Sequence, residues 1–585
     1  MKLLLGPMLR HVTETTATVW VETDEACEVT ILHACAPTFS AYGHHYALVV
    51  ITGLEPGSTT VYEVRLDGER HWPLPHESSA GPDLPDSVIR THHAGMTQRL
   101  MFGSCRSAAP HEPPYSLELD HDDRGRGIDA LWAYGRRMRH QPPDEWPTLL
   151  VFLGDQVYAD DSSPQARERI EQRRPDDGLP PEIVANFEEY TWLYREAWAP
   201  PLERWMMSVV PSVMIFDDHD MIDDWNISDS WVEMIRQQPW WSKHIIGGLS
   251  SYWIYQHLGN LSPAQLEHEG MLAEVQELGD ATAYLEQWAL ESESFTPVPG
   301  GYQFSYVREL GDVRLVMIDV RNGRLLERGK RRIVDDGEWN WIRESCLAPC
   351  QHLLLGSSLP VFVPGGLHGI QRWNEALCNR APRSVRSRIG ERMRQSIDLE
   401  DWSAFAASFD SMIDLLAATA TATATRDAPD TITVLSGDIH FAYVADVHLG
   451  ATKAGPAPAG AALMGTAPLR SAIRQVVSSP IRNALVARER RVIRFASSRV
   501  GRWIGQRLVR RLPSTATHTA EWDMVHGPYF ANNIGVLTFT PATNSPPGSA
   551  EMTAHLALLG ADTGGDEQRD PITLARVALN SGHSG

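Results

Sequence analysis

The sequence predicts an α/β protein with a buried sheet, preceded at the N-terminus by an all-β domain. Two observations predict this arrangement. Up to about residue 96, segments such as TATVWVET and CEVTILHA alternate apolar and polar residues, which is typical of strands in a β-sandwich. From residue 97, short apolar runs alternate with helical stretches rich in Trp, Glu and Arg, which is typical of a sheet covered by helices.

Composition limits the classes of protein and partner. The chain has 585 residues, a formal net charge of −22 at pH 7 and six irregularly spaced cysteines. So long a chain predicts two or more domains, and the cysteines do not form a disulfide framework. The negative charge disfavours nucleic acid or an anionic membrane as the main partner. Neither a membrane span nor a signal peptide is recognisable, so we expect a cytoplasmic location.

Residues 1–96 are expected to form a fibronectin III-like sandwich. The segment YALVVITGLEPGSTTVYEVRLDG contains two strand patterns around a Gly/Pro turn. Because a common fold says little about function, the simplest role for this domain is packing or spacing.

In the second domain, residues 97–560, apolar runs end in polar residues. The runs are RLMFGSC, TLLVFLGDQVY, SVMIFDDHD, VRLVMIDVR, HLLLGSSLP and TITVLSGDIH. Ligands in open α/β sheets gather at one set of strand ends, so we expect these polar endings to meet in one cleft.

The polar endings are rich in residues that bind metal ions. Five carboxylates lie between Asp217 and Asp224, and such closely spaced acids repel one another unless cations neutralise them. Together with the Cys, Tyr and His of the other endings they form a set of metal ligands. Scattered turn acids and helix caps are the alternative explanation, but they account poorly for so many titratable groups at strand ends.

These motifs resemble one family. The order Ser-Cys, Gly-Asp-x-x-Tyr, Asp-Asp-His-Asp and Ser-Gly-Asp-x-His is similar to that of the alkaline phosphatase D (PhoD-like) metallophosphoesterases. The segments IDVRNGR and DDGEWNWIRESC and the N-terminal sandwich fit the same family. The resemblance of the chain to this family is weakest at residues 451–520. The resemblance implies a metallophosphoesterase-like sandwich of layered sheets flanked by helices. It also implies a hydrolase that uses a metal-activated hydroxide on phosphate mono- or diesters.

The resemblance also implies roles for individual residues. Iron (Fe³⁺) and calcium, or other divalent metals, would be held by Cys105, Asp155, Tyr158, Asp218, Asp438 and His440. Asp155 would be the bridging carboxylate, and His219 would protonate the leaving oxygen. Arg106 is a candidate to clamp the phosphate, and Asn226 is a candidate substrate-binding residue. We expect Arg321 to form a buried pair with Asp319 rather than to act as a clamp.

The sequence departs from the family at several positions. Ala159 and Asp160 follow Tyr158 where the secreted members carry Glu, and Ser358 stands where the wider superfamily has a ligand His. Arg106 follows the Cys where Gln is often found. The twin-Arg export signal of the family, whose members are often secreted, is missing. These departures bear on the full metal set, the calcium requirement and the location.

A basic helical insertion is expected at about 470–515. Within it, residues 470–511 carry an Arg-rich face opposite Val, Ile and Trp, which would suit a membrane or an anionic partner. We favour the alternative, an insertion that packs on the acidic protein, borders the site and does not attach stably to a membrane. Residues 451–468 are expected to form a loop, and residues 561–585 a C-terminal tail.

Two other functional classes stay open. The same site would serve a nuclease or a phospholipid-directed phosphodiesterase, with the basic segment docking the polymer or bilayer. The second class is a non-catalytic binding protein that retains only a relic of the site. Purified protein without bound metal would favour this second class.

Overall fold

The computed structural model describes ten stretches of the chain. These are residues 1–73, 84–174, 179–293, 302–379, 384–423, 426–451, 469–510, 512–542, 552–561 and 571–580. The predicted loop at 451–468 therefore lies almost wholly outside the described residues. Within the described stretches, no helix is both long and apolar enough to cross a lipid bilayer.

The N-terminal domain is all-β, as predicted. Its ten strands are β1 Leu3–Val12, β2 Ala17–Thr23, β3 Glu28–Ile31, β4 Ala34–Pro37, β5 Phe39–Ala41, β6 His44–Ile51, β7 Thr59–Val61, β8 Val64–Leu66, β9 Glu69–Trp72 and β10 Val88–Arg90. They form sheets in the orders β1-β2-β6-β5 and β4-β3-β8-β9, with a separate β10-β7 pair. Apolar side chains from the two larger sheets share one core, which includes Val19, Val49 and Val64. The fibronectin III-like identity of this domain stays a prediction.

One face of the N-terminal domain packs closely against the second domain. Trp20 lies 5.2 Å, ring centroid to ring centroid, from Tyr255 of the second domain. The buried guanidinium of Arg10 donates hydrogen bonds to the carbonyl of Tyr255, at 3.0 Å, and to Asn260, at 3.1 Å. The two domains therefore share a packed and hydrogen-bonded interface.

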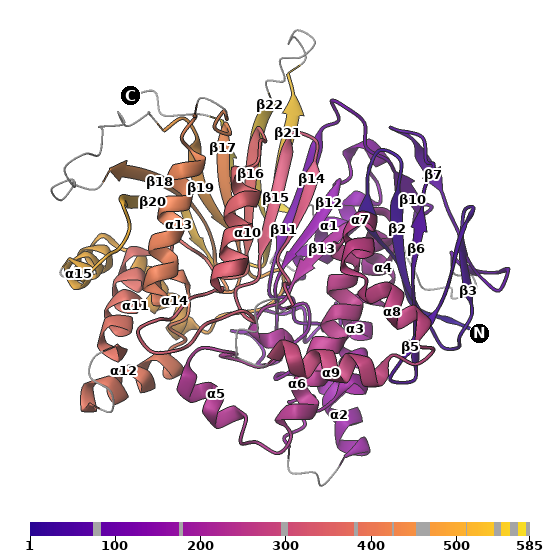
Figure 1. Cartoon of the computed structure of the whole chain (residues 1–585), viewed down its shortest axis with the longest axis horizontal. Coiled ribbons are helices and arrows are strands. Elements are labelled where there is room, and N and C mark those ends of the chain that lie inside the picture. Colours follow the sequence, from indigo (N-terminus) through magenta and orange to yellow (C-terminus); the bar gives the residue numbers. More distant parts are fainter. Residues whose placement is uncertain are drawn as a thin grey trace.

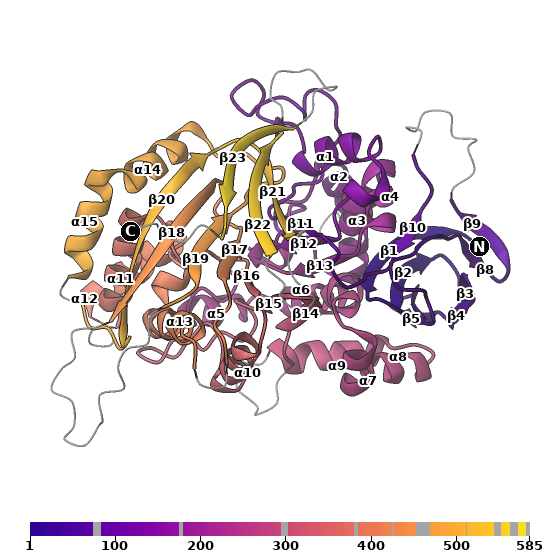
Figure 2. The same ribbon diagram turned by 90° about the horizontal axis from the view of Figure 1, so that it is seen from above.

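Two mixed sheets form the centre of the second domain (Figures 1 and 2). The six-stranded sheet has the order β13 Ser212–Ile215, β12 Leu149–Leu153, β11 Gln98–Gly103, β21 Asn533–Pro541, β22 Met552–Gly560 and β23 Ile572–Ala578. The seven-stranded sheet has the order β14 Tyr306–Leu310, β15 Val313–Ile318, β16 His352–Ser357, β17 Thr431–Ser436, β19 Ala472–Val477, β18 Ala442–Ala451 and β20 His518–Tyr529. Rings from the two sheets meet where His352 and Phe539 lie 4.9 Å apart.

Helices of the second domain lie on the outer faces of the sheets, beyond the strand ends and at the outer edge of the molecule (Figures 1 and 2). They are α1 Ala130–Met138, α2 Pro164–Arg173, α3 Phe187–Trp198, α4 Pro201–Val209, α5 Asp229–Ile235, α6 Trp241–Ser251, α7 Pro263–Glu269, α8 Met271–Glu277, α9 Thr282–Glu293, α10 Asp336–Leu347, α11 Gly365–Cys378, α12 Val385–Ser396, α13 Ala406–Thr419, α14 Ala487–Ser497 and α15 Arg499–Val509. Several begin at N-caps that the sequence supplies, since Asp129, Ser163 and Asn186 accept hydrogen bonds from the first turns of α1, α2 and α3. Figure 2 shows α10 and α13 on one side of the sheets and α1 and α4 on the other.

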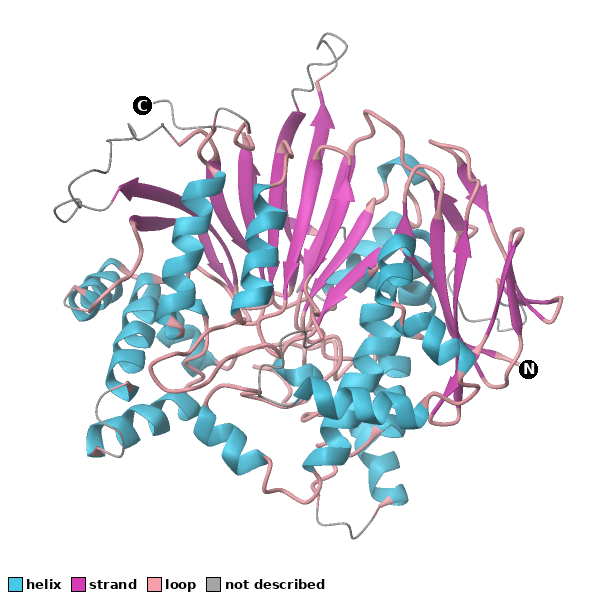
Figure 3. Ribbon diagram, in the orientation of Figure 1, coloured by secondary structure: helices cyan, strands magenta, loops and turns pink. Residues whose placement is uncertain are grey.

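Strand direction brings the predicted polar endings together. β11, β12 and β13 are parallel to one another, and so are β15, β16, β17 and β19. The loops that follow these strands gather in the middle of the molecule, between the sheets and the lower helices (Figure 3). The prediction that the polar strand ends meet at one place is therefore confirmed.

Two predicted boundaries are wrong. Residues 472–477 of the supposed helical insertion form β19, which pairs with β17 and β18 inside the seven-stranded sheet. Residues 572–578 of the supposed tail form β23, which pairs with β22 at the edge of the six-stranded sheet. In both places the strand pattern is short and flanked by turn residues, so strand formation depends on partners outside the segment itself.

Candidate metal centre

Strained backbone marks the strand ends where the predicted ligands lie. Cys105, Asp155, Asp438 and His440 have φ angles of 57°, 49°, 64° and 54°. Residues other than glycine rarely adopt this left-handed conformation, and each costs about 1–3 kcal/mol. The surrounding packing holds four such residues at one place, which is typical of functional sites.

A glycine allows two of these strand ends to approach closely. Gly154 has a φ of 102°, and a Cβ built on it would lie 2.5 Å from Cβ of Asp217. Any side chain here would therefore push apart the loops after β12 and β13, which carry Asp155 and Asp218.

Asp155 lies at the centre of the predicted ligands. Its oxygens belong to two groups whose candidate ligand atoms all lie within 4.8 Å of one another: Cys105, Asp155 and His440, and Asp155, Asp218 and His219. A third such group contains Asp217, Asp218 and Asp438. Asp155 is thus common to two groups of candidate ligand atoms.

The Asp155 carboxylate is fully buried, and neither of its oxygens has a hydrogen-bond partner. Burial raises its pKa well above the ordinary value, and the neighbouring Asp217 and Asp218 raise it further. An unpaired carboxylate in such a place is costly, and a cation between the groups would remove that cost. The residues present therefore fit the metal ions that the resemblance implies.

Cys105 shares a candidate ligand group with Asp155 and His440, and Tyr158 lies close enough to Cys105 and Asp155 for them to affect the pKa of its phenol. The Cys105 Sγ accepts a hydrogen bond from Ser479 Oγ at 3.3 Å, and the Tyr158 hydroxyl accepts one from Asn483 Nδ2 at 3.0 Å. Burial and neighbouring acidic groups raise the pKa of the Cys105 thiol and of the Tyr158 phenol. Either group would need a strongly acidic cation to ionise at neutral pH.

His219 is oriented by a residue outside the predicted set. Its Nδ1 lies 2.9 and 3.0 Å from the two Asp160 oxygens, and its ring centroid lies 4.8 Å from that of Tyr158. Burial disfavours the charged imidazolium, but Asp160 outweighs this and the pKa of His219 is raised. Nδ1 faces Asp160, whereas Nε2 lies 4.0 Å from Asp223 Oδ1, beyond hydrogen-bond distance, and is the atom available to a substrate or a metal ion. In the sequence, Asp160 could have been recognised as the acid two positions after the Tyr of Gly-Asp-x-x-Tyr.

The five acids of residues 217–224 have different roles. Asp220 accepts hydrogen bonds from the backbone amides of Asp155 and Asp217, both at 2.9 Å, and so joins the two loops. The backbone amide of Asp224 donates to Asp218, at 3.2 Å. Asp223 lies at the exposed edge of the cluster, and its backbone amide donates a hydrogen bond to the Asp160 carboxylate. Hydrogen bonds therefore offset the negative charge of some of these acids, and a metal ion would be needed only for the rest.

Arg321 compensates another part of the cluster. Its fully buried side chain forms ion pairs with Asp217 and Glu400, and lies 3.1 Å from an oxygen of Asp218. The expected side-chain pair with Asp319 is wrong, because the Asp319 carboxylate accepts from the backbone amides of Arg321 and Asn322 and not from the Arg321 guanidinium. Glu400 was not predicted, since it lies far away in the sequence and outside any recognisable motif.

Arg106 faces away from this cluster. Its guanidinium donates to Asp129 and Glu203, each at 2.8 Å, and to the carbonyl of Ala197 at 2.6 Å. Each of its three nitrogens is thus occupied, and the side chain is 4% exposed. These contacts contradict the prediction that Arg106 clamps a phosphate, and we assign it a structural role.

Two further positions border the centre. The Asn226 side chain donates to the carbonyl of Arg321 at 3.1 Å, so it supports the loop rather than facing open solvent. Ser358, at the position of the missing ligand His, is buried and its hydroxyl has no partner. Its Cβ would lie 3.3 Å from a Cβ added to Gly154, so it does reach the centre.

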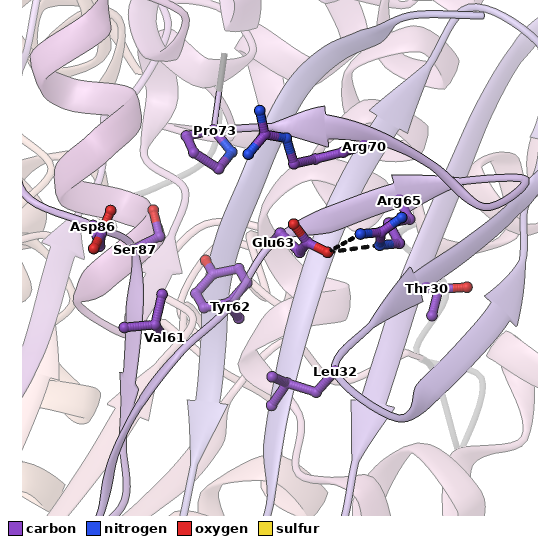
Figure 4. Close-up of a pocket in the computed structure, with 10 residues that line it drawn as sticks. All are labelled: Thr30, Leu32, Val61, Tyr62, Glu63, Arg65, Arg70, Pro73, Asp86 and Ser87. Carbon is purple, nitrogen blue, oxygen red and sulfur yellow. Dashed lines mark hydrogen bonds and ion pairs between the residues drawn. The ribbon is translucent and has the colours of Figure 1, made fainter. Parts of the chain in front are cut away.

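A separate pocket lies on the N-terminal domain (Figure 4). Its volume is about 430 Å³, and its lining includes Tyr62, Arg70 and an ion pair between Glu63 and Arg65. None of the predicted ligands lines it, so it is distinct from the metal centre.

Comparison of the sequence with known families supports the motif assignment. The family model described as PhoD-like phosphatase matches residues 130–250, which contain Asp155, Tyr158, Asp218 and His219. The predicted resemblance to the PhoD-like phosphatases is thereby confirmed. The model described as domain of unknown function (DUF7800) matches residues 1–85. No curated protein matches the sequence.

Two solved structures are similar to nearly the whole chain. A structure of PhoD has 11% sequence identity and a TM-score of 0.46, over 98% of this chain and 92% of that one. The purple acid phosphatase PPD1 from yellow lupin (Lupinus luteus) seeds has 10% identity and a TM-score of 0.42, over 97% and 73%. The family model, rather than these distant likenesses, supports the assignment.

Proposed function

We propose that this protein is a metal-dependent phosphoester hydrolase that acts on phosphate mono- or diesters. The observation that carries the proposal is Asp155, a fully buried carboxylate without hydrogen bonds that is shared by two groups of metal-ligand atoms. The PhoD-like phosphatase match around it supports the same activity.

Cys105, Tyr158 and His440 would hold one ion, and Asp218 and Asp438 another, with Asp155 between them. Thiolate and phenolate favour a ferric ion on the first side, whereas the carboxylates suit calcium or another divalent cation on the second. When bound, such cations would neutralise the phosphate and lower the pKa of a water molecule.

The positive charge for the substrate would come mainly from these ions. The three arginines near the centre, Arg106, Arg321 and Arg324, all form ion pairs with buried carboxylates. The pairs of Arg321 with Asp217 and Glu400 hold the loop after β13 in place. Such positioning, together with charge neutralisation, provides most of the catalysis in phosphoryl transfer.

His219 is the residue we propose for proton transfer to the leaving oxygen. Asp160 orients the imidazole through Nδ1 and stabilises its protonated form. A proton on Nε2 is then available to an alkoxide that departs on the exposed side of the ring, which is 23% exposed. A group in this role is worth about 10²–10⁴-fold in rate.

The test combines metal analysis with hydrolysis of aryl phosphate mono- and diesters. We expect purified protein to contain metal, chelation to abolish hydrolysis, and added iron or calcium to restore part of it. Asp155→Asn should lose both metal and activity. Asp446→Asn is the control, since Asp446 pairs with Arg474 away from the centre. Full hydrolysis by protein shown to be metal-free would refute the proposal.

A further inference from the structure

The two-helix segment α14–α15, residues 487–509, exposes large apolar side chains. Val492, Phe495, Val500 and Trp503 are 55%, 55%, 57% and 56% exposed. In Figures 1 and 2 the two helices lie at the outer edge of the molecule, beside α11 and β20. Exposed single apolar residues are ordinary, but four on one pair of short helices form a patch that suggests a partner.

The packing of α15 is the reverse of what its amphipathic pattern predicts. Its buried residues are Gly501 and Gly505, and a Cβ on Gly505 would lie 2.0 Å from the carbonyl oxygen of Gly365 in α11. α15 thus packs its glycine face on the protein and leaves Val500 and Trp503 outside.

The same helices carry concentrated positive charge. Between residues 487 and 510 the chain has one acidic residue, Glu489, and these arginines: Arg488, Arg490, Arg491, Arg494, Arg499, Arg502, Arg507 and Arg510. Within the described part of the chain, only Arg490 and Arg502 of this set pair with acids, namely Asp120 and Asp523. Most of these arginines therefore have no acidic partner among the described residues.

We propose that the α14–α15 segment docks this protein on the surface of an anionic lipid bilayer. Helices that lie in a membrane interface combine Trp, Phe and aliphatic side chains with arginines that reach the anionic headgroups. Arg507 already lies over the Trp503 ring, 4.9 Å from its centre, so aromatic and basic groups alternate on one surface. This proposal replaces the expectation from the sequence that the segment stays free of membranes.

The charge distribution favours contact between an anionic bilayer and the protein at this segment alone. The whole chain has a formal net charge of −22, so an anionic surface would repel most of the molecule. The basic patch would then set the orientation as well as the attachment. A polyanion such as nucleic acid would match the arginines but would leave Val492, Phe495 and Val500 exposed.

The loop that leads into α14 also contacts the candidate metal centre. Asn483, which donates to Tyr158, lies in the loop that leads directly into α14. Ser479 of the same loop donates to Cys105. The attachment itself does not depend on catalysis, so its test is independent of the proposed function.

The experiment is flotation of the full-length protein with vesicles at physiological salt. One set contains phosphatidylcholine alone, and the other contains phosphatidylcholine with phosphatidylglycerol. We expect the protein to float with the anionic vesicles only. Val500→Ser with Trp503→Ser, and separately Arg499→Gln with Arg510→Gln, should weaken binding by about tenfold or more. All four positions are exposed, and thermal unfolding would verify that each variant is folded.

Leu278→Ser is the matched control, because Leu278 is 51% exposed on a different part of the surface. It should bind the vesicles like the wild type. Absence of binding to anionic vesicles, or equal binding by all variants, would overturn the proposal. A protein that stays unbound but forms a dimer, lost on Trp503→Ser by light scattering, would identify a second copy as the occupant and overturn it too.

Discussion

Replacing Asp160 by Asn tests whether this carboxylate holds the proton on His219. The substitution preserves the size of the side chain and an oxygen that accepts from Nδ1, but removes the negative charge. In the metal-loaded protein the bound cations would offset the charges of Asp155 and Asp218. Asp160 would then be the main anionic partner of the imidazolium.

The geometry sets the size of the effect. Opposite unit charges at the 2.9 Å separation of His219 Nδ1 and Asp160 Oδ1 attract by about 6 kcal/mol at an effective dielectric constant of about 20, and by about 1.4 kcal/mol in water. The two side chains are 23% and 9% exposed, so we expect about 3 kcal/mol, or about two pKa units.

The sign follows from which form is stabilised. Asp160 favours charged His219, so its loss lowers the pKa of His219 and the proton-donating form disappears at a lower pH. In Asp160→Asn the basic limb of the kcat profile should therefore move down by about two pH units for a poor leaving group such as phenyl phosphate. On the acidic side of the new limb, kcat should approach that of the wild type.

Asp161→Asn provides the control, since Asp161 is 57% exposed and pairs with Arg167. Its kcat profile should match that of the wild type. If the basic limb of Asp160→Asn stays within about half a pH unit of the wild-type limb, Asp160 does not tune His219. A uniform loss of kcat at every pH would instead indicate that Asp160 only shapes the loop.

Four further substitutions test the proposed roles of single residues. His219→Ala should lower kcat on phenyl phosphate by about 10²-fold or more, and by less on a nitrophenyl ester; equal losses would make His219 a ligand. Iron-loaded protein should absorb visible light, Tyr158→Phe should shift or bleach the band, and Cys105→Ser should weaken iron retention. An unchanged spectrum in both variants would exclude this ligation. Arg106→Ala should reduce the free energy of unfolding by about 3–5 kcal/mol, because it leaves buried carboxylates unpaired; unchanged denaturant unfolding would contradict its structural role.

The sequence was sufficient to name candidate ligands that the structure brings together, and their role as ligands stays a prediction. Each apolar run that ends in Asp, Cys or His became a buried strand followed by a loop, because an apolar run of this length is most stable when both faces are covered. Parallel strands place such endings at one edge, so Asp155, Asp218 and His440 could be brought together without knowledge of the fold. Asp160 was visible only as a departure from the family motif.

The tertiary structure decided which partner each charged or apolar side chain meets. Arg106 follows a candidate ligand in sequence, yet its guanidinium turns to Asp129 and Glu203, which only the packing of α1 and α4 brings near. An amphipathic pattern shows that Trp503 and the arginines share a helix, but not which face the protein covers. Local sequence determines strand, helix and turn through short-range sterics and hydrophobic periodicity. Pairing and burial depend on contacts between residues hundreds of positions apart, and only the folded chain specifies those.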